Sequence, residues 1–211
     1  MRITKFGHAC VRIEHGDAVV VIDPGVFTDP DAVDGATAVL VTHEHPDHLL
    51  ADHLRRTDAP VFTIDGVAAV LRAEAPDVAE RVTVVRPGDR LEVAGATVEV
   101  IGEKHAVIHP DYPRFDNSGY VLEVGGATVY HPGDSLTAPG RSVDVLLAPV
   151  RAPWLKVGEA VDFVREVAAP RSLAIHDCIY SEAGLGMVER HMANLLPEGQ
   201  VFVRRAPGED L

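Results

Sequence analysis

VTHEHPDHLL (residues 41–50) places three histidines and one aspartate within six positions, directly after the apolar run ATAVLVT. In an extended segment, residues two apart project from the same face, so His43 and His45 can offer both imidazoles to one ion. The chain then turns at the proline, and Asp47 and His48, at the expected start of a helix, point towards a second ion. Imidazole and carboxylate without thiolate are the ligands expected for zinc, iron or manganese.

Three further residues that can bind metal come just after other strand-like runs. His105 follows ATVEVIG, Asp134 follows ATVYHPG, and His176 follows SLAI. Loops at strand ends in layered α/β folds gather into one site. The sequence therefore predicts that these side chains meet the histidines of residues 41–50 at one rim.

The rest of the chain alternates short apolar strands with helices. Strands are expected at 2–7, 10–15, 18–23, 37–42, 60–64, 82–85, 90–95, 96–102, 118–125, 126–133, 143–150 and 172–176, and helices at 47–56, 66–75, 158–168 and 184–196. Strands dominate the early part of each half and helices follow. This order favours sheets covered by outer helices, within one domain over residues 1–211.

Composition excludes several classes of partner. The chain has 211 residues, a formal net charge of −13 and 46% hydrophobic residues, which is the profile of a globular domain. Such a charge repels duplex nucleic acid and anionic membranes. We find no apolar region after the N-terminal basic residues and no apolar run approaching ~18 residues, so a cytoplasmic protein is expected. Cys10 and Cys178 are too few for a disulfide framework.

The ordered motifs H-x-H-x-D-H, a lone His, HPGDS and AIHD resemble those of the metallo-β-lactamase fold superfamily, and Asp23 in VIDPG matches its first motif. The resemblance spans nearly the whole chain. It implies an α/β protein with a four-layer αβ/βα sandwich and a binuclear metal site at the rim between two sheets. It also implies that Asp23 orients the site from behind the ligands.

The resemblance assigns each ligand. It implies that His43, His45 and His105 hold the first metal, that Asp47, His48 and His176 hold the second, and that Asp134 bridges both. His8 and His131 are expected to support the site or the core rather than bind metal, and Cys178 is expected to be a small buried side chain.

FGHACVRI and YHPGD are similar to the small branch related to ascorbate-6-phosphate lactonase. This similarity implies a metal-dependent hydrolase with two divalent ions, zinc foremost, with manganese or iron as alternatives. A hydroxide shared by the ions would cleave a small anionic ester, either a lactone or a phosphodiester. Asp134 would hold the ions together and Asp47 would orient the nucleophile. The branch is also compatible with a homo-oligomer.

Loop residues supply candidate contacts for an anionic substrate. His109, on a proline-rich loop, is a candidate proton donor or substrate contact, and Arg114 lies on the same loop. Arg151, Trp154 and Lys156 follow a buried strand, and a tryptophan flanked by two cations suits the wall of an anion site. In the alternative interpretation, Trp154 packs on the following helix and the two cations face water.

Two other functions use the same ligands. One is an iron-dependent oxidoreductase or dioxygenase on the same fold, acting on sulfur compounds or oxygen. The other is a non-catalytic binding module stabilised by metal, although a structural zinc site normally closes four ligands around one ion.

Overall fold

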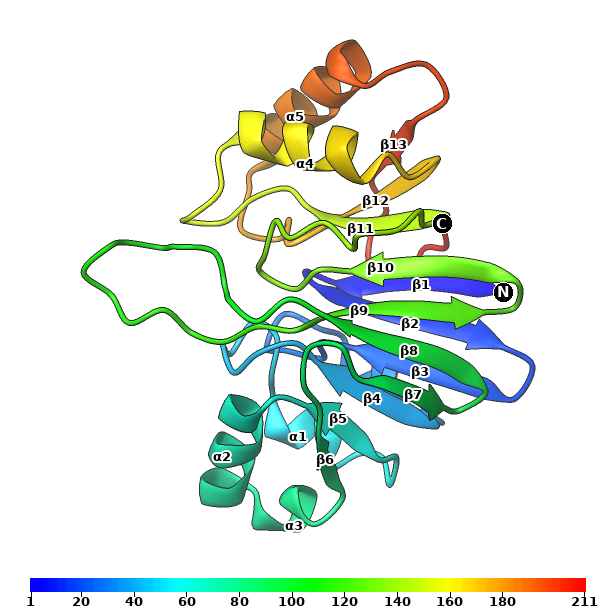
Figure 1. The fold of residues 1–211 in the computed structure, drawn as a ribbon, viewed down its shortest axis with the longest axis vertical. Helices are drawn as coiled ribbons and strands as arrows, with labels where there is room; N and C mark the ends of the chain where they lie inside the picture. Colours follow the sequence, from blue (N-terminus) through cyan, green and yellow to red (C-terminus); the bar gives the residue numbers. More distant parts are fainter.

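The computed structural model describes all residues, 1–211, and contains two β-sheets (Figure 1). The first sheet has the order β1 (Arg2–Gly7), β2 (Cys10–His15), β3 (Ala18–Ile22), β4 (Ala38–Val41), β5 (Val61–Thr63) and β6 (Val82–Val84). The second has the order β13 (Val201–Val203), β12 (Arg171–Ile175), β11 (Val145–Pro149), β10 (Ala127–His131), β9 (Gly119–Val124), β8 (Ala96–Ile101) and β7 (Arg90–Val93). In the first sheet, β1 to β3 pair antiparallel and the later strands pair parallel. In the second sheet, β7 to β10 pair antiparallel, and β10 to β13 pair parallel.

Helices cover the outer face of each sheet (Figure 1). The helices are α1 (Ala51–Leu54), α2 (Asp65–Glu74), α3 (Pro76–Ala79), α4 (Val157–Val167) and α5 (Glu182–Leu195), with a 3₁₀ turn at Pro30–Val33. One apolar cluster joins the two sheets, a second packs α4 and α5 on the second sheet, and a third packs α2 on the first. The four-layer αβ/βα sandwich expected from the sequence is confirmed.

Burial patterns explain why these segments are strands. The residues of β8 alternate between buried and partly buried, which fits a strand near a sheet edge with one face on the core. All residues of β4 and β11 are buried, because the partner sheet covers one face and helices cover the other. The continuous apolar runs in the sequence therefore mark the central parallel strands.

The helix expected at 47–56 is wrong over its first turn, since α1 contains only Ala51–Leu54. The backbone N–H groups of His48 and Leu49 both donate to the carbonyl of His45, at 2.9 Å each, which makes a tight turn instead of a helix. This turn aims Asp47 and His48 back towards the preceding histidines.

The sequence also failed to predict α3 and β13. No helix combines the length and apolar character required to cross a membrane.

Candidate metal centre

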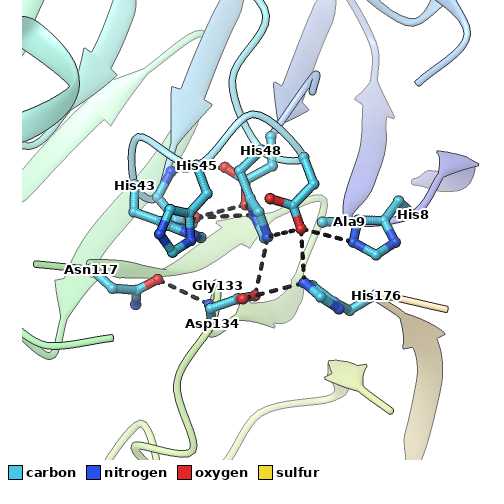
Figure 2. A network of polar contacts seen from close by, with 12 residues as sticks. His8, Ala9, His43, His45, His48, Asn117, Gly133, Asp134 and His176 are labelled. Atoms are coloured by element: carbon cyan, nitrogen blue, oxygen red, sulfur yellow. Dashed lines mark hydrogen bonds and ion pairs between the residues drawn. The ribbon is translucent and has the colours of Figure 1, made fainter. Parts of the chain in front are cut away.

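Loops at the ends of four strands bring the predicted ligands to one edge of the two sheets, and Figure 2 shows His43, His45, His48, Asp134 and His176 among them. His43 and His45 follow β4, and His105 follows β8. Asp134 follows β10 and His176 follows β12. Parallel strands and crossover loops thus place residues up to 133 positions apart in the sequence around one point.

The first ligand cluster contains His43, His45, His105 and Asp134, whose ligand atoms all lie within 4.8 Å of one another. His43 Nε2 is 3.0 Å from His45 Nδ1, and Asp134 Oδ2 is 3.3 Å from His105 Nε2. Nitrogen and oxygen atoms from four side chains converge on one point, which is the arrangement that a divalent transition metal requires.

The second cluster contains His8, Asp47, His48 and His176, again with ligand atoms within 4.8 Å of one another. Asp134 adjoins this cluster too, because its Oδ1 lies 3.1 Å from His48 Nε2 and its Oδ2 lies 3.2 Å from His176 Nε2 (Figure 2). Asp134 is therefore the carboxylate that faces both clusters. All seven residues predicted as ligands are brought together.

Unpartnered buried atoms support metal binding here. The Nε2 atoms of His48, His105 and His176 and Oδ1 of Asp134 are buried and make no directed hydrogen bond. Buried polar atoms are almost always satisfied, so four orphans at one point indicate a missing partner. Two divalent cations would satisfy all four, and the residues present fit a binuclear site.

The far ring nitrogens of four ligand histidines meet acceptors of the protein. The pairs are His43 Nδ1 with the Thr42 hydroxyl at 3.0 Å, His48 Nδ1 with Asp23 Oδ2 at 2.7 Å, His105 Nδ1 with the Ala106 carbonyl at 2.5 Å, and His176 Nδ1 with the Arg151 carbonyl. An Nδ1–H that donates outward leaves the Nε2 lone pair directed into the site. These contacts fix the orientation of each ring, so that Nε2 faces the site and can bind metal once it carries no proton.

Asp23, at the end of β3, connects the strands to the ligands. Its carboxylate accepts hydrogen bonds from the backbone N–H and hydroxyl of Thr42 and from His48 Nδ1, each at 2.7 Å. It is fully buried and has a φ of 53°, a left-handed conformation that a short polar side chain tolerates. Asp23 therefore fixes His48 relative to the end of β4.

His8 lies closer to the metal ligands than the sequence indicated. Its Nε2 is 3.1 Å from Asp47 Oδ2, and its Nδ1 is 3.1 Å from the sulfur of Cys178. His8 directly follows β1, so the rule that found the other ligands, a histidine just after a strand, also applies to it.

The expected buried position of Cys178 is wrong, since the residue is exposed. Partial desolvation and the nearby carboxylates of Asp177 and Asp47 raise the pKa of its thiol to about 11.

His131 supports the turn that carries Asp134. Its Nε2 donates to the Ala9 carbonyl at 2.9 Å, and its Nδ1 accepts from the Gly133 N–H at 3.1 Å. Both ring nitrogens are used, and the side chain is fully buried. His131 therefore ties the Asp134 turn to the first sheet.

Trp154 contacts Asp134, the carboxylate that faces both clusters. Its indole Nε1 donates to Asp134 Oδ2 at 3.0 Å. Its ring lies edge-on to His105 and His176, with centroids 5.8 and 6.4 Å away. The sequence suggested that Trp154 either packs on the following helix or forms a wall for the substrate. Neither interpretation includes its hydrogen bond to Asp134, through which Trp154 positions that carboxylate.

The other predicted substrate contacts differ in their surroundings. The Arg151 guanidinium lies 4.5 Å above the Tyr180 ring, and Arg114 Nε donates to the His105 carbonyl at 2.7 Å. His109 contacts Asp111 and Tyr112 on its own loop, with its side chain exposed. Lys156 is highly exposed and pairs with Glu159 at 3.8 Å, where α4 begins.

Electrostatics explain how the metal-free site is stabilised. Burial opposes a charged imidazole at His176, but the carboxylates of Asp134 and Asp47 outweigh burial and raise its pKa to about 9. The carboxylates of Asp134 and Asp23 likewise outweigh burial and raise the pKa of His48. The two imidazoles in turn lower the pKa of Asp134, which burial alone would raise.

Metal binding is expected to release protons at neutral pH. A ligand imidazole must be neutral, whereas His176 and His48 stay protonated below their raised pKa values. Zinc affinity should therefore rise as pH increases from 7 to 9, by up to about tenfold per pH unit for each proton displaced. Calorimetric titration in two buffers with different ionisation enthalpies measures the release. Identical heats in both buffers would contradict it.

Trp154→Phe is expected to weaken zinc binding by about tenfold or more, because outer hydrogen bonds to a ligand typically contribute that much affinity. Competition with a chromophoric chelator measures the change. Trp154 is the only tryptophan, so zinc should also alter the fluorescence of the wild-type protein. An unchanged affinity in Trp154→Phe would show that the indole does not position Asp134.

Comparison with known proteins identifies relatives of this chain. The family model described as "Beta-lactamase superfamily domain" matches residues 2–176. "Protein Rv0786c" of Mycobacterium tuberculosis is 39% identical over 193 residues, covering 89% of each chain. A "UPF0173 metal-dependent hydrolase" of Methanosphaerula palustris is 30% identical over 194 residues, covering 83% of each chain.

A solved structure has the same fold. The metallo-β-lactamase fold protein YhfI of Bacillus subtilis matches with a TM-score of 0.76 and 13% identity, covering 100% of this chain and 98% of that one. The family match covers most of the sequence, including every ligand of both clusters. The chain therefore belongs to the β-lactamase superfamily and has the metallo-β-lactamase fold.

Proposed function

We propose that the protein is a metal-dependent hydrolase with a binuclear centre. The observation that carries the proposal is the pair of ligand clusters that share Asp134 and leave four buried polar atoms without a directed hydrogen bond. Relatives named metal-dependent hydrolases support the reaction class. A structural zinc site would close four ligands around one ion and would not need this pairing.

The side chains of the centre have different roles in the proposed hydrolysis. Two divalent ions held by these residues would lower the pKa of a water molecule and polarise the bond to be cleaved. Asp134 holds both sites together. Asp47 is partly open to solvent, with 26% of its side chain exposed, and can orient the proton of an attacking water. His8, through its contact with Asp47 Oδ2, fixes that carboxylate.

We propose a small anionic ester as substrate, either a lactone or a phosphodiester. Arg151 and Arg114 support an anion near the site because both adjoin predicted ligands: the Arg151 carbonyl accepts from His176 Nδ1, and Arg114 Nε donates to the His105 carbonyl. Arginine binds carboxylates and phosphates through parallel N–H groups. Lys156 gives no such support, since it pairs with Glu159 at the surface.

The choice of metal follows from the ligand set. Imidazole and carboxylate without thiolate suit zinc or manganese, and also iron. We propose zinc first. Metal analysis of protein purified without added metal, followed by removal with a chelator and reloading with zinc, manganese or iron, identifies the ion that restores activity.

A panel of lactones, phosphodiesters, thioesters and β-lactams tests the reaction class. Hydrolysis is expected to increase with pH, to disappear with a chelator and to return with zinc or manganese. If the metal-loaded protein cleaved none of them but consumed oxygen with a thiol or persulfide, the iron-dependent oxidoreductase would replace the hydrolase.

A further inference from the structure

Only two side chains of the ligand clusters are partly open to solvent. Six of the eight side chains in the two clusters are buried, and the exceptions are His45 in the first cluster and Asp47 in the second. A substrate must therefore approach the metals past these two residues. The side chains around them decide which substrates can bind.

Phe27 lies beside His8, the neighbour of the partly exposed Asp47. Its ring centroid is 5.3 Å from that of His8, which itself contacts Asp47. Phe27 is 49% exposed, although its loop is fixed by hydrogen bonds from the Val26 N–H to the Pro46 carbonyl at 2.8 Å and from the Asp29 N–H to the Phe6 carbonyl at 3.0 Å. These backbone hydrogen bonds on either side of Phe27 hold it in an exposed position.

Phe115 lies beside the opening at His45. The two ring centroids are 4.6 Å apart, with an interplanar angle of 68°. Phe115 is 36% exposed, and its carbonyl accepts the N–H of the ligand His105 at 3.1 Å. An exposed phenyl ring on a hydrogen-bonded loop therefore lies near each of the two partly exposed residues, directly at His45 and through His8 at Asp47.

A cavity provides room next to Phe27. It has a volume of about 440 Å³ and reaches from Phe27 and His8 past Tyr180 to Leu185. Its charged wall residues are Lys5, Arg204 and Arg205 together with Asp177, Glu182, Glu189 and Glu209. Lys5 pairs with Asp177, and Arg204 pairs with Glu182 and Glu189. The volume is within the range of small-molecule sites, and Phe27, Tyr180 and Leu185 give part of the wall an apolar surface.

We propose that Phe27 and Phe115 bind an apolar acyl or aryl group next to the bond that is cleaved. This inference rests on the proposed hydrolase function and refines its substrate: the anionic ester is an amphiphile rather than a purely polar molecule. Exposed apolar side chains at the mouth of a site commonly mark a ligand surface. Burial of each methylene against such rings contributes about fourfold in affinity.

Binding of straight-chain carboxylates to the zinc-loaded protein tests the apolar contact without requiring turnover. Octanoate is expected to bind at least about tenfold more tightly than acetate by calorimetry, since part of its chain leaves water. Phe27→Ala and Phe115→Ala should each reduce this preference by about threefold or more, and Phe27→Leu should retain most of it. Met187→Ala removes a similarly exposed side chain on α5 and should leave the preference unchanged.

Hydrolysis of aryl esters with acyl chains of increasing length separates this inference from the proposed function. A kcat/KM that rises with chain length, and rises less in Phe27→Ala and Phe115→Ala, supports both. Hydrolysis with no dependence on chain length, together with equal binding of acetate and octanoate, overturns the apolar contact alone. Absence of hydrolysis across the ester series and the wider panel overturns the proposed function, and with it this inference. If sedimentation showed a dimer that both alanine variants dissolve, the rings would cover a second copy instead of substrate.

Discussion

Asp134→Ala is expected to lose both metal ions and to lower kcat/KM by at least about a thousandfold. Its carboxylate lies 3.1–3.3 Å from ligand nitrogens of both clusters, at His48, His105 and His176. Removal of the shared ligand deprives each ion of one donor and leaves several imidazoles facing one another. Metal ions contribute several kcal/mol to stabilisation of the transition state, and each 1.36 kcal/mol is a factor of ten.

Elemental analysis of metal per chain measures this result, with His176→Ala as the matched comparison. His176 belongs to the second cluster, so its removal should chiefly empty one site and leave about one ion per chain. Retention of two ions by Asp134→Ala would show that Asp134 does not hold the two sites together.

Gly25→Ala is expected to destabilise the protein by about 3 kcal/mol or more and to empty the second metal site. A Cβ at this position would lie 2.1 Å from both the carbonyl carbon and the carbonyl oxygen of Asp47, and 2.5 Å from the His48 nitrogen. All three are backbone atoms, so no side-chain rotation relieves the overlap. The whole turn that carries two ligands must move, which exceeds the usual cost of overpacking.

Gly186→Ala is the control for Gly25→Ala. Gly186 lies within α5, and a Cβ there would meet no atom within 4 Å. Alanine should stabilise the helix by up to about 1 kcal/mol. Chemical denaturation and metal analysis of both variants test the pair. A Gly25→Ala protein with wild-type stability and two ions would show that the turn is not held in this position.

Much of the fold could be predicted because its signals are local. Continuous apolar runs marked β4 and β11, and Ala-Gly and Gly-Gly turns marked the hairpins that form β7 with β8 and β9 with β10. The start of α1 could not be predicted, because the turn at residues 46–50 depends on tertiary contacts of its backbone. One such contact is the hydrogen bond from the Val26 N–H to the Pro46 carbonyl.

The candidate site was only partly predictable for a similar reason. The seven ligands lie in motifs or just after strands, whereas the role of His8 depends on its distance to Asp47 across the first sheet. The hydrogen bond from Trp154 to Asp134 also depends on loop geometry that no local pattern encodes. Residues that support a ligand from another part of the chain require the structure.

Anomalous X-ray diffraction from crystals of the zinc-loaded protein, recorded on both sides of the zinc absorption edge, tests the binuclear centre most directly. Two zinc peaks about 3.5–4 Å apart are expected, the usual separation in two-metal sites. One should lie among His43, His45 and His105, the other among Asp47, His48 and His176, and Asp134 should lie between them. A single peak, or a second peak away from Asp134, would contradict the account.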